Sequence, residues 1–282
     1  MSQIKIAGVM RAGAYSPNHV GNDAAIFNAA AEQLRKRGYE VNIYSEEQFQ
    51  STDISEPVIL NMCRERESIA KLQRLETEGR LVVNSGFGIE NCTRERIGHG
   101  IPYPESITVN TNENVRDQLE KSGFEGFWIK RGDFHAMHKE DVSYCRHAEE
   151  AQEVLQEYFY RGIPRAVINR HLPGDLIKFY GISGQPFFYW FYPFDMGHSK
   201  YGHEAVNGHS QGLPFSTETL KSICQKAAEV LDVVVYGGDC IVGADQSIQI
   251  IDFNDWPSFA PCRAKAAPFI AKAVTALINK RF

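Results

Sequence analysis

The chain has 282 residues, of which 43% are hydrophobic and 23% charged, a composition that excludes a disordered or fibrous protein. Thirty basic and 35 acidic residues give a formal net charge of −5, which argues against a general nucleic-acid-binding protein. Six scattered cysteines without a Cys-x-x-Cys pair are typical of a reducing compartment. The first residues lack a signal-peptide pattern, and the longest charge-free apolar stretch, 179–194, is interrupted by glycines and prolines. We therefore expect a cytoplasmic protein that binds neither nucleic acid nor membrane.

Strands and helices alternate over the first hundred residues. Hydrophobic spacing predicts strands at 4–10, 40–44, 57–62 and 81–84 and helices at 22–37 and 68–78. Such alternation predicts a parallel sheet covered by helices, with a ligand site beyond the carboxyl ends of its strands. The candidates for substrate recognition in the strand-end loops, any one of which could instead cap a helix, are Arg11, Tyr15, His19, Asn22 and Arg64.

Two boundaries divide the chain into three predicted units. The stretch Ile101-Pro-Tyr-Pro104 ends the first unit, 1–104. A small unit follows at 105–164, with predicted helices at 112–122 and 149–160 and strands at 126–130 and 142–146. In the last unit, 165–282, strands are predicted at 166–171, 175–182, 186–191, 234–242 and 247–254, a polar loop at 195–214, and helices at 217–231 and 264–279. The predicted fold class is mixed, α/β followed by α+β.

Three oxygen-bearing side chains near the C-terminus form the strongest functional motif. Asp239 lies in one predicted strand, and Asp252 and Asn254 lie in the next, where alternation places the latter two on one face. If the two strands pair as a hairpin, Asp239 lies within reach of both. Two carboxylates and an amide oxygen favour Mg²⁺ shared with substrate phosphates over Zn²⁺. The alternative is that charged residues simply end the strands.

Two further motifs are weaker by themselves. Lys130 ends an apolar strand before a glycine, where its ammonium could bind a phosphate or merely reach solvent. The segment 167–180 is an apolar strand, a Pro-Gly turn and a second strand that carries Asp175 and Lys178. Alone it predicts an ordinary hairpin.

In this order the three motifs resemble the ATP-grasp superfamily, and the resemblance covers the layout of the whole chain. It implies an ATP-grasp fold with an N-terminal parallel α/β domain, a small lid domain and a larger C-terminal domain with an antiparallel sheet. It also implies ATP and Mg²⁺ as cofactors, with Mg²⁺ on Asp239, Asp252 and Asn254 and the ATP phosphates on Lys130. The other nucleotide contacts that it implies are an adenine hinge at Asn169, Arg170, His171 and Leu172, the ribose ligand Asp175, and Lys178 on the phosphate side, as in inositol phosphate kinases.

The sequence departs from the family pattern at several places. Arginines stand where the family usually has a second lysine, so Arg94 or Arg96 is the candidate replacement. Arg170 stands in the hinge where an acidic or neutral residue is commoner, and the lid loop 131–138 has one glycine and two histidines. A zinc site in the loop 197–204 is less favoured than a polar loop. The residues concerned are His198, Lys200, His203 and Glu204, and the roles of His135, His138, His198 and His203 stay open.

The resemblance implies an ATP-dependent ligase that joins a carboxylate to an amine through an acyl phosphate, with Lys130, Lys178 and Arg94 as catalytic residues. The partner would be a small-molecule substrate with a carboxylate, which no motif identifies. One alternative is a small-molecule kinase with a hydroxyl acceptor, which Lys178 favours. Another is a nucleotide-binding scaffold without catalysis. A homodimer is suggested only by analogy with relatives.

Overall fold

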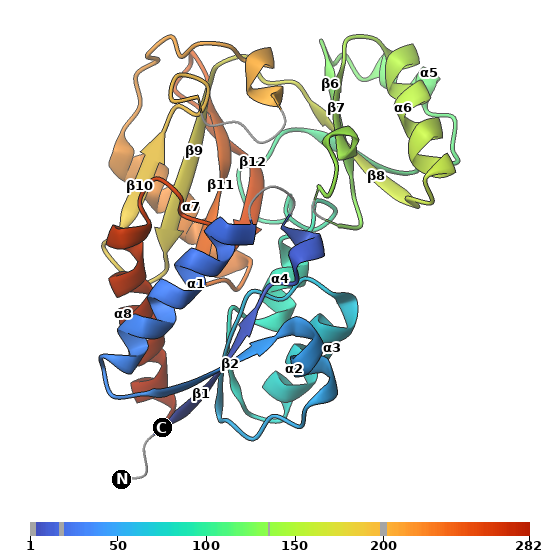
Figure 1. Ribbon diagram of the computed structural model, residues 1–282. Helices are drawn as coiled ribbons and strands as arrows, with labels where there is room; N and C mark the ends of the chain where they lie inside the picture. Colours follow the sequence, from blue (N-terminus) through green and yellow to red (C-terminus); the bar gives the residue numbers. More distant parts are fainter. Residues whose placement is uncertain (1–3, 17–19, 135, 198–201) are drawn as a thin grey trace.

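A computed structural model describes residues 4–16, 20–134, 136–197 and 202–282 (Figure 1). Within these ranges the framework consists of three four-stranded sheets, one in each part of the chain. The expectation of a mixed α/β and α+β fold is confirmed, because the first sheet is parallel and the other two are antiparallel.

The N-terminal sheet has the strand order β2-β1-β3-β4. Its strands are β1 (Lys5–Met10), β2 (Glu40–Ser45), β3 (Val58–Asn61) and β4 (Leu81–Val83), and its helices are α1 (Val20–Arg35), α2 (Glu46–Ser51), α3 (Arg66–Thr77) and α4 (Gly86–Asn91). The four strands are those that the hydrophobic spacing predicts. The short helices α2 and α4 were not predicted, because six residues are too few to establish a helical period. Because β1 and β3 are adjacent parallel strands, the loops that follow them leave the same edge of the sheet.

The small sheet, which we call the lid sheet, has the order β5-β8-β6-β7. Its strands are β5 (Ser106–Asn110), β6 (Phe127–Arg131), β7 (Val142–Cys145) and β8 (Arg165–Arg170), and its helices are α5 (Arg116–Lys121) and α6 (Ala148–Tyr160). The sequence analysis missed β5 and began the third unit at 165. β8 instead pairs with β5 and β6, so the lid sheet extends past that boundary to Arg170. The reason is that an apolar strand pattern does not reveal which sheet its partners belong to.

The C-terminal sheet has the order β10-β9-β11-β12. Its strands are β9 (Asp175–Ile182), β10 (Phe188–Phe191), β11 (Val235–Val242) and β12 (Ile248–Asp255), with helices α7 (Thr217–Val230) and α8 (Arg263–Arg281). The predicted hairpin between the last two strands is confirmed by their antiparallel pairing. Gly238 permits a close approach there, because a Cβ at this position would lie 2.2 Å from the carbonyl oxygen of Asp252.

One hydrophobic core joins the N-terminal and C-terminal units. It contains Ile6 of β1, Phe27 of α1, Val235 of β11, Ile270 of α8 and, just after β12, Trp256, all fully buried. Helices α1 and α8 lie side by side between the two sheets, although they come from opposite ends of the chain (Figure 1). This packing fixes the strand ends of the N-terminal sheet against the end of β12.

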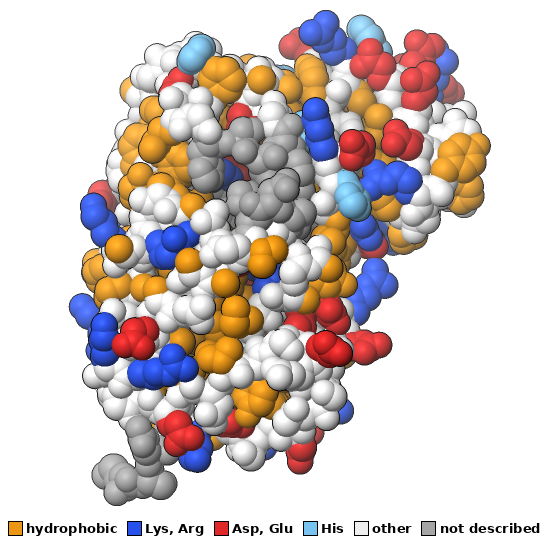
Figure 2. Space-filling model, in the orientation of Figure 1, with side chains coloured by type: hydrophobic (Ala, Val, Ile, Leu, Met, Phe, Trp, Pro, Cys, Tyr) orange, Lys and Arg blue, Asp and Glu red, His pale blue; other side chains and the backbone are white. Residues whose placement is uncertain are grey.

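The face of the molecule in Figure 2 does not show a single dominant charge. Figure 2 shows acidic and basic side chains interspersed over the face in view, as the small net charge suggests. Within the described ranges, no helix has the length and hydropathy that a membrane span requires.

Candidate active site

A cavity of about 320 Å³ lies where the three units meet. Its walls come from the strand-end loops of the N-terminal sheet, from β6 and β8 of the lid sheet, and from β9, β11 and β12 of the C-terminal sheet. The cavity thus collects residues that are up to about 250 positions apart in sequence, from Arg11 to Ser258.

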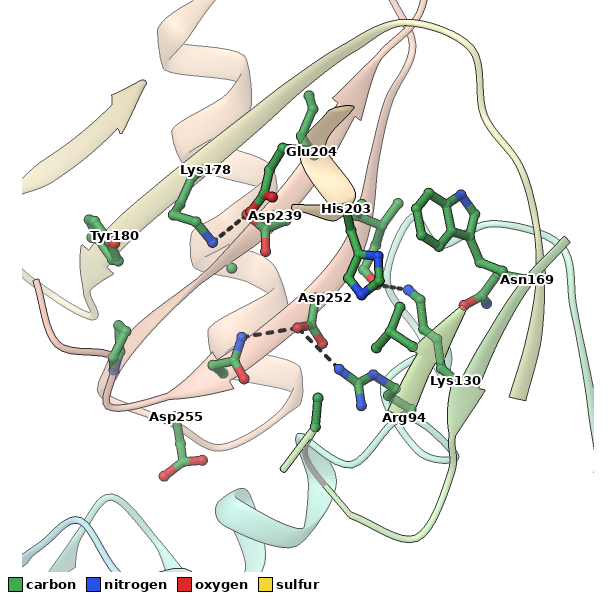
Figure 3. Close-up of a pocket in the computed structure, with 18 of the residues that line it drawn as sticks. Arg94, Lys130, Asn169, Lys178, Tyr180, His203, Glu204, Asp239, Asp252 and Asp255 are labelled. Carbon is green, nitrogen blue, oxygen red and sulfur yellow. Dashed lines mark hydrogen bonds and ion pairs between the residues drawn. The ribbon is translucent and has the colours of Figure 1, made fainter. Parts of the chain in front are cut away.

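A row of charged side chains crosses the floor of the cavity. Asp239 of β11 pairs in register with Lys178 of β9 on one side and with Asp252 of β12 on the other. The ammonium of Lys178 donates to Asp239 Oδ1 at 2.6 Å, and the Asn254 amide donates to Asp252 Oδ2 at 3.3 Å. Figure 3 shows Asp239 and Asp252 turned toward the same space. Cross-strand neighbours of this kind lie only about 5 Å apart at their Cβ atoms.

The two carboxylates and the Asn254 amide fit a hard divalent cation. All three offer oxygen atoms from one face of two adjacent strands, and such oxygens are the preferred ligands of Mg²⁺. The positions are those that strand alternation predicts. Among the described residues, no group of three His, Cys, Asp or Glu side chains has a metal-binding arrangement, so the amide would be needed as the third protein ligand.

Lys130 reaches this row from the lid sheet. It is only 6% exposed, and its Nζ donates to the carbonyl oxygen of Ile251 at 2.6 Å, which spans the gap between lid and C-terminal sheets. Burial lowers the pKa of Lys130 to about 8, an effect that Asp252 opposes and Arg94 reinforces. Because an ammonium buried without a full counter-charge is unfavourable, the site is prepared to receive an anion.

Of the two candidate replacements for the second lysine, Arg94 is the one that lines the cavity. Its Nη2 lies 3.6 Å from Asp252 Oδ2, and its buried Nε has no hydrogen-bond partner among the described residues. Arg94 and Lys130 hold the pKa of Asp252 below its ordinary value despite burial, and the Asp239 carboxylate raises that of Lys178 despite burial. Arg96, the other candidate, instead pairs with Glu90 at 2.9 Å on the exposed surface.

The wall above the charged row suits a flat apolar ring. Three of the four predicted hinge residues, Asn169, Arg170 and Leu172, line the cavity. The buried Nδ2 of Asn169 has no hydrogen-bond partner within the described part of the chain. The sequence analysis missed the apolar lining, since in sequence such side chains look like any buried strand residue; these are Pro104, Trp128, Val142, Leu176, Ile241 and Ile251.

Two predicted nucleotide ligands do not line the cavity. Asp175 is 2% exposed, and its carboxylate accepts from the backbone N–H groups of Gln211 at 2.7 Å and Leu213 at 2.8 Å. His171 accepts from Trp128 Nε1 at 3.1 Å through its Nδ1. Both side chains hold neighbouring segments in place, and the ribose role of Asp175 and the adenine role of His171 stay predictions.

The N-terminal end of the cavity contains three of the five residues proposed for substrate recognition. Arg11, Tyr15 and Arg64 line it, whereas Asn22 accepts a hydrogen bond from Arg263 at 2.9 Å outside the lining. His19 lies outside the described residues. The sequence analysis missed four further lining residues at this end, which are Ser16, Asp23, Asp255 and Trp256.

The four histidines whose roles the sequence left open lie in different places. His135 and His198 lie outside the described residues, as does Lys200. His203 and Glu204 line the cavity, and the Nε2 of His203 lies 3.2 Å from the carbonyl oxygen of Lys139. His138 precedes the short helix Lys139–Asp141, and its backbone N–H donates to Asp141 Oδ2 at 3.0 Å.

No protein-family model matches the sequence, and no curated protein matches it either. Solved structures match it over nearly its whole length. A D-alanyl-alanine synthetase A from Vibrio cholerae superposes with a TM-score of 0.68 at 10% identity, covering 98% of both chains. A D-alanine–D-alanine ligase from Bacillus anthracis, complexed with ATP, gives 0.65 at 15% identity over 99% of this chain and 97% of that one.

A third similar structure is described as an ATP-grasp ligase. The ATP-grasp ligase PsnB, complexed with a minimal precursor, gives a TM-score of 0.61 at 16% identity and covers 97% of this chain and 99% of that chain. The chain therefore has the ATP-grasp fold, as the sequence resemblance implied. At these identities the likeness establishes the fold, and the chemistry has to be argued from the residues of the cavity.

Proposed function

We propose that this protein is an ATP- and Mg²⁺-dependent ligase that joins a carboxylate to an amine through an acyl phosphate. The observation that carries the proposal is the row Lys178–Asp239–Asp252 with Lys130 facing it from the other sheet. Such an arrangement concentrates metal-binding oxygens and cations around one point, which is what transfer of a phosphoryl group requires. Ligases with this fold support it, among them one described as complexed with ATP.

Each part of the cavity has a defined role in this proposal. The apolar wall with Asn169 holds the adenine ring, and Lys130, Arg94 and Lys178 neutralise the phosphate oxygens. Asp239, Asp252 and Asn254 would hold Mg²⁺, which supplies positive charge to the phosphates when bound. Enclosure by the lid sheet excludes water, which would otherwise hydrolyse the acyl phosphate.

The reaction has two bond exchanges. A carboxylate oxygen of the acid attacks the γ-phosphorus, the bond from that phosphorus to the bridging oxygen breaks, and ADP leaves. The amine nitrogen then attacks the acyl carbon, the bond from that carbon to the phosphate oxygen breaks, and inorganic phosphate leaves while the nitrogen gives up a proton. The cations that stabilise the first step also stabilise the departing phosphate of the second.

A kinase is the second candidate. Lys178 lines the cavity beside Asp239, and it is the residue whose predicted phosphate contact resembles that of the inositol phosphate kinases. A kinase would transfer the γ-phosphoryl group to a hydroxyl and stop there, leaving a stable phosphoester.

Product analysis separates these functions. Purified protein is incubated with Mg·ATP and a panel of carboxylic acids, with and without hydroxylamine, which traps acyl phosphates as hydroxamates. The proposal predicts ADP formation coupled to one hydroxamate per ADP, and phosphate release only when a nucleophile is present. A phosphoester that survives hydroxylamine indicates the kinase, and the absence of ADP with every acid contradicts the ligase.

A further inference from the structure

Two buried arginines close the end of the cavity that lies away from the adenine wall. Arg11 follows β1 and Arg64 follows β3, the adjacent central strands of the N-terminal sheet. Their side chains are only 9% and 6% exposed, and both line the cavity. Guanidinium groups are rarely buried to this extent unless they bind anions.

Both guanidinium groups converge on the end of β12. Arg64 Nη2 donates to the carbonyl oxygen of Asp255 at 2.9 Å, and Arg11 Nη2 donates to the next carbonyl oxygen along the chain, that of Trp256, at 3.1 Å. Each also forms one ion pair, Arg11 with Asp23 at 2.8 Å and Arg64 with Asp255 at 2.6 Å. The two positive groups are therefore neighbours, and burial together with the charge of Arg64 lowers the pKa of Arg11.

A single buried carboxylate holds the backbones of the two arginine loops. Glu46, the first residue of α2, is 1% exposed and accepts from the N–H groups of Ala12 at 3.0 Å and of Arg64 and Glu65 at 2.7 Å each. One side chain thus fixes the residue after Arg11 and Arg64 itself. The guanidinium groups are held in place before any ligand arrives, which favours specific binding.

Each guanidinium retains N–H donors that these contacts do not use. A guanidinium has five N–H groups. Arg11 donates three bonds, through Nε to the Met62 carbonyl and through both Nη atoms. Arg64 also donates three, including one to the Cys63 carbonyl. Within the described ranges this leaves two N–H groups on each arginine without a partner.

The charge balance identifies the class of anion. Three carboxylates, Asp23, Asp255 and the backbone-bound Glu46, lie beside the two guanidinium groups, so the cluster carries no excess positive charge. Four free N–H donors without excess positive charge suit a singly charged carboxylate better than a doubly charged phosphate. Asp255 is three residues beyond Asp252, about 10 Å along an extended strand. Figure 3 shows Asp255 apart from Asp239 and Asp252 of the charged row. An acid held here by one carboxylate can present another at the charged row.

We propose that Arg11 and Arg64 bind a second, non-reacting carboxylate of the acid, so that the preferred substrate is a short dicarboxylic acid. This inference rests on the proposed function for the identity of the reacting group. The hydroxamate assay compares acids that differ only in the second carboxylate: succinate with succinamate, glutarate with glutaramate, aspartate with asparagine and glutamate with glutamine. We expect the KM of the better diacid to be about 10- to 100-fold below that of its half-amide.

Arginine variants test the residues named. Arg11→Met is expected to raise the KM of the diacid at least about tenfold and to raise that of the half-amide much less, so that the difference between the two acids shrinks. Arg11→Lys, which keeps the charge and loses the planar donors, is expected to give a KM for the diacid between those of the wild type and Arg11→Met. Arg66→Met is the matched control, because Arg66 is 76% exposed and pairs with Asp133 outside this cavity. Equal KM values for diacid and half-amide in the wild type, or preference for a phosphorylated acid such as 3-phosphoglycerate, overturn the inference.

A binding measurement separates this inference from the proposed function. Calorimetric titration of the same acid pairs into protein saturated with Mg²⁺ and a non-hydrolysable ATP analogue needs no turnover. Tighter binding of a diacid that is lost in Arg11→Met supports the subsite even if no hydroxamate forms, in which case the ligase proposal alone fails. If no diacid binds more tightly than its half-amide, the inference is wrong whether or not the protein turns over ATP.

Discussion

Lys130 is a buried lysine, and its surroundings stabilise the charged ammonium only in part. It is buried between two sheets, yet its ammonium faces a carboxylate row and a carbonyl oxygen rather than a full counter-ion. Burial lowers its pKa to about 8, so the lysine is only partly protonated at slightly alkaline pH. A bound phosphate would supply the missing negative charge and restore the charged form.

Nucleotide binding is therefore expected to depend on pH through Lys130. The free-state pKa is about 8 and the bound-state pKa is higher, so binding takes up a proton between the two values. The Kd of a non-hydrolysable ATP analogue should be flat below about pH 7 with respect to this group. Above pH 8 it should rise by up to about tenfold per pH unit. Calorimetry in buffers of different ionisation enthalpy measures the proton uptake.

The matched variant is Lys130→Arg, whose guanidinium stays charged throughout this range. It should remove the slope above pH 8 while keeping measurable affinity. A slope that persists unchanged in this variant shows that another group carries the dependence.

At this scale the sequence predicted the residues that lie on neighbouring strands and missed roles that depend on distant loops. Asp252 and Asn254 were placed correctly on one face because alternation in a strand is strict, and Asp239 followed from the hairpin. The carboxylate of Asp175 accepts from the backbone N–H groups of residues 211 and 213, contacts that no local pattern reveals, and its ribose role stays a prediction. The arginine pair at Arg11 and Arg64 was flagged only as single candidates.

At the scale of elements, the position of β11 depends on a side chain from the N-terminal sheet. Asn84, which follows β4, is fully buried. Its Oδ1 accepts from the N–H groups of Val234 at 2.8 Å and Val235 at 2.9 Å, and its Nδ2 donates to the carbonyl oxygen of Val235 at 2.8 Å. One amide thus fixes the start of the strand that carries Asp239.

Asn84→Ala is expected to lower the free energy of unfolding by about 2–4 kcal/mol, because it removes the acceptor of the Val234 and Val235 N–H groups, whereas the Val235 carbonyl keeps its bond from the Trp256 N–H. Chemical denaturation measures this change. Asn28→Ala is the control, since Asn28 is exposed on α1, and its effect should stay within about 0.5 kcal/mol. Similar stabilities for the two variants contradict the anchoring role of Asn84.

Element boundaries were predictable where hydrophobic spacing was regular. The strands of the N-terminal sheet and the last hairpin were predicted because their apolar residues are continuous or alternate clearly. β5 (Ser106–Asn110) was missed because only Val109 in it is buried, so it carries almost no apolar signal. The assignment of β8 to the lid sheet depends on its pairing with β5 and β6, which the sequence does not encode locally.

At the scale of the whole molecule, the cavity exists only because the lid sheet lies against the other two units. Contacts across that junction include Lys130 with Ile251, Arg94 with the Phe134 carbonyl at 3.5 Å, and Arg165 with Glu95 at 3.0 Å. The cavity is thus enclosed by parts of the chain that belong to different sheets, and a ligand in it would contact both walls.

Hydrogen exchange should report this shared contact. With Mg²⁺ and a non-hydrolysable ATP analogue, we expect slower amide exchange in β6 and β12 together, about tenfold or more, because the ligand stabilises both walls. Helix α3 (Arg66–Thr77), on the outside of the N-terminal sheet, serves as the internal reference. Protection confined to one of the two strands contradicts binding between the sheets.

The most direct test measures how nucleotide binding depends on the charged row of Lys178, Asp239 and Asp252. Calorimetric titration with a non-hydrolysable ATP analogue is run with and without Mg²⁺ on the wild type, on Asp252→Asn and on Asp245→Asn. Asp245→Asn makes the same charge change in the exposed loop of the same hairpin. We expect Mg²⁺-dependent binding that Asp252→Asn weakens about tenfold or more and Asp245→Asn leaves unchanged. Wild-type affinity and Mg²⁺ dependence in Asp252→Asn would contradict this expectation.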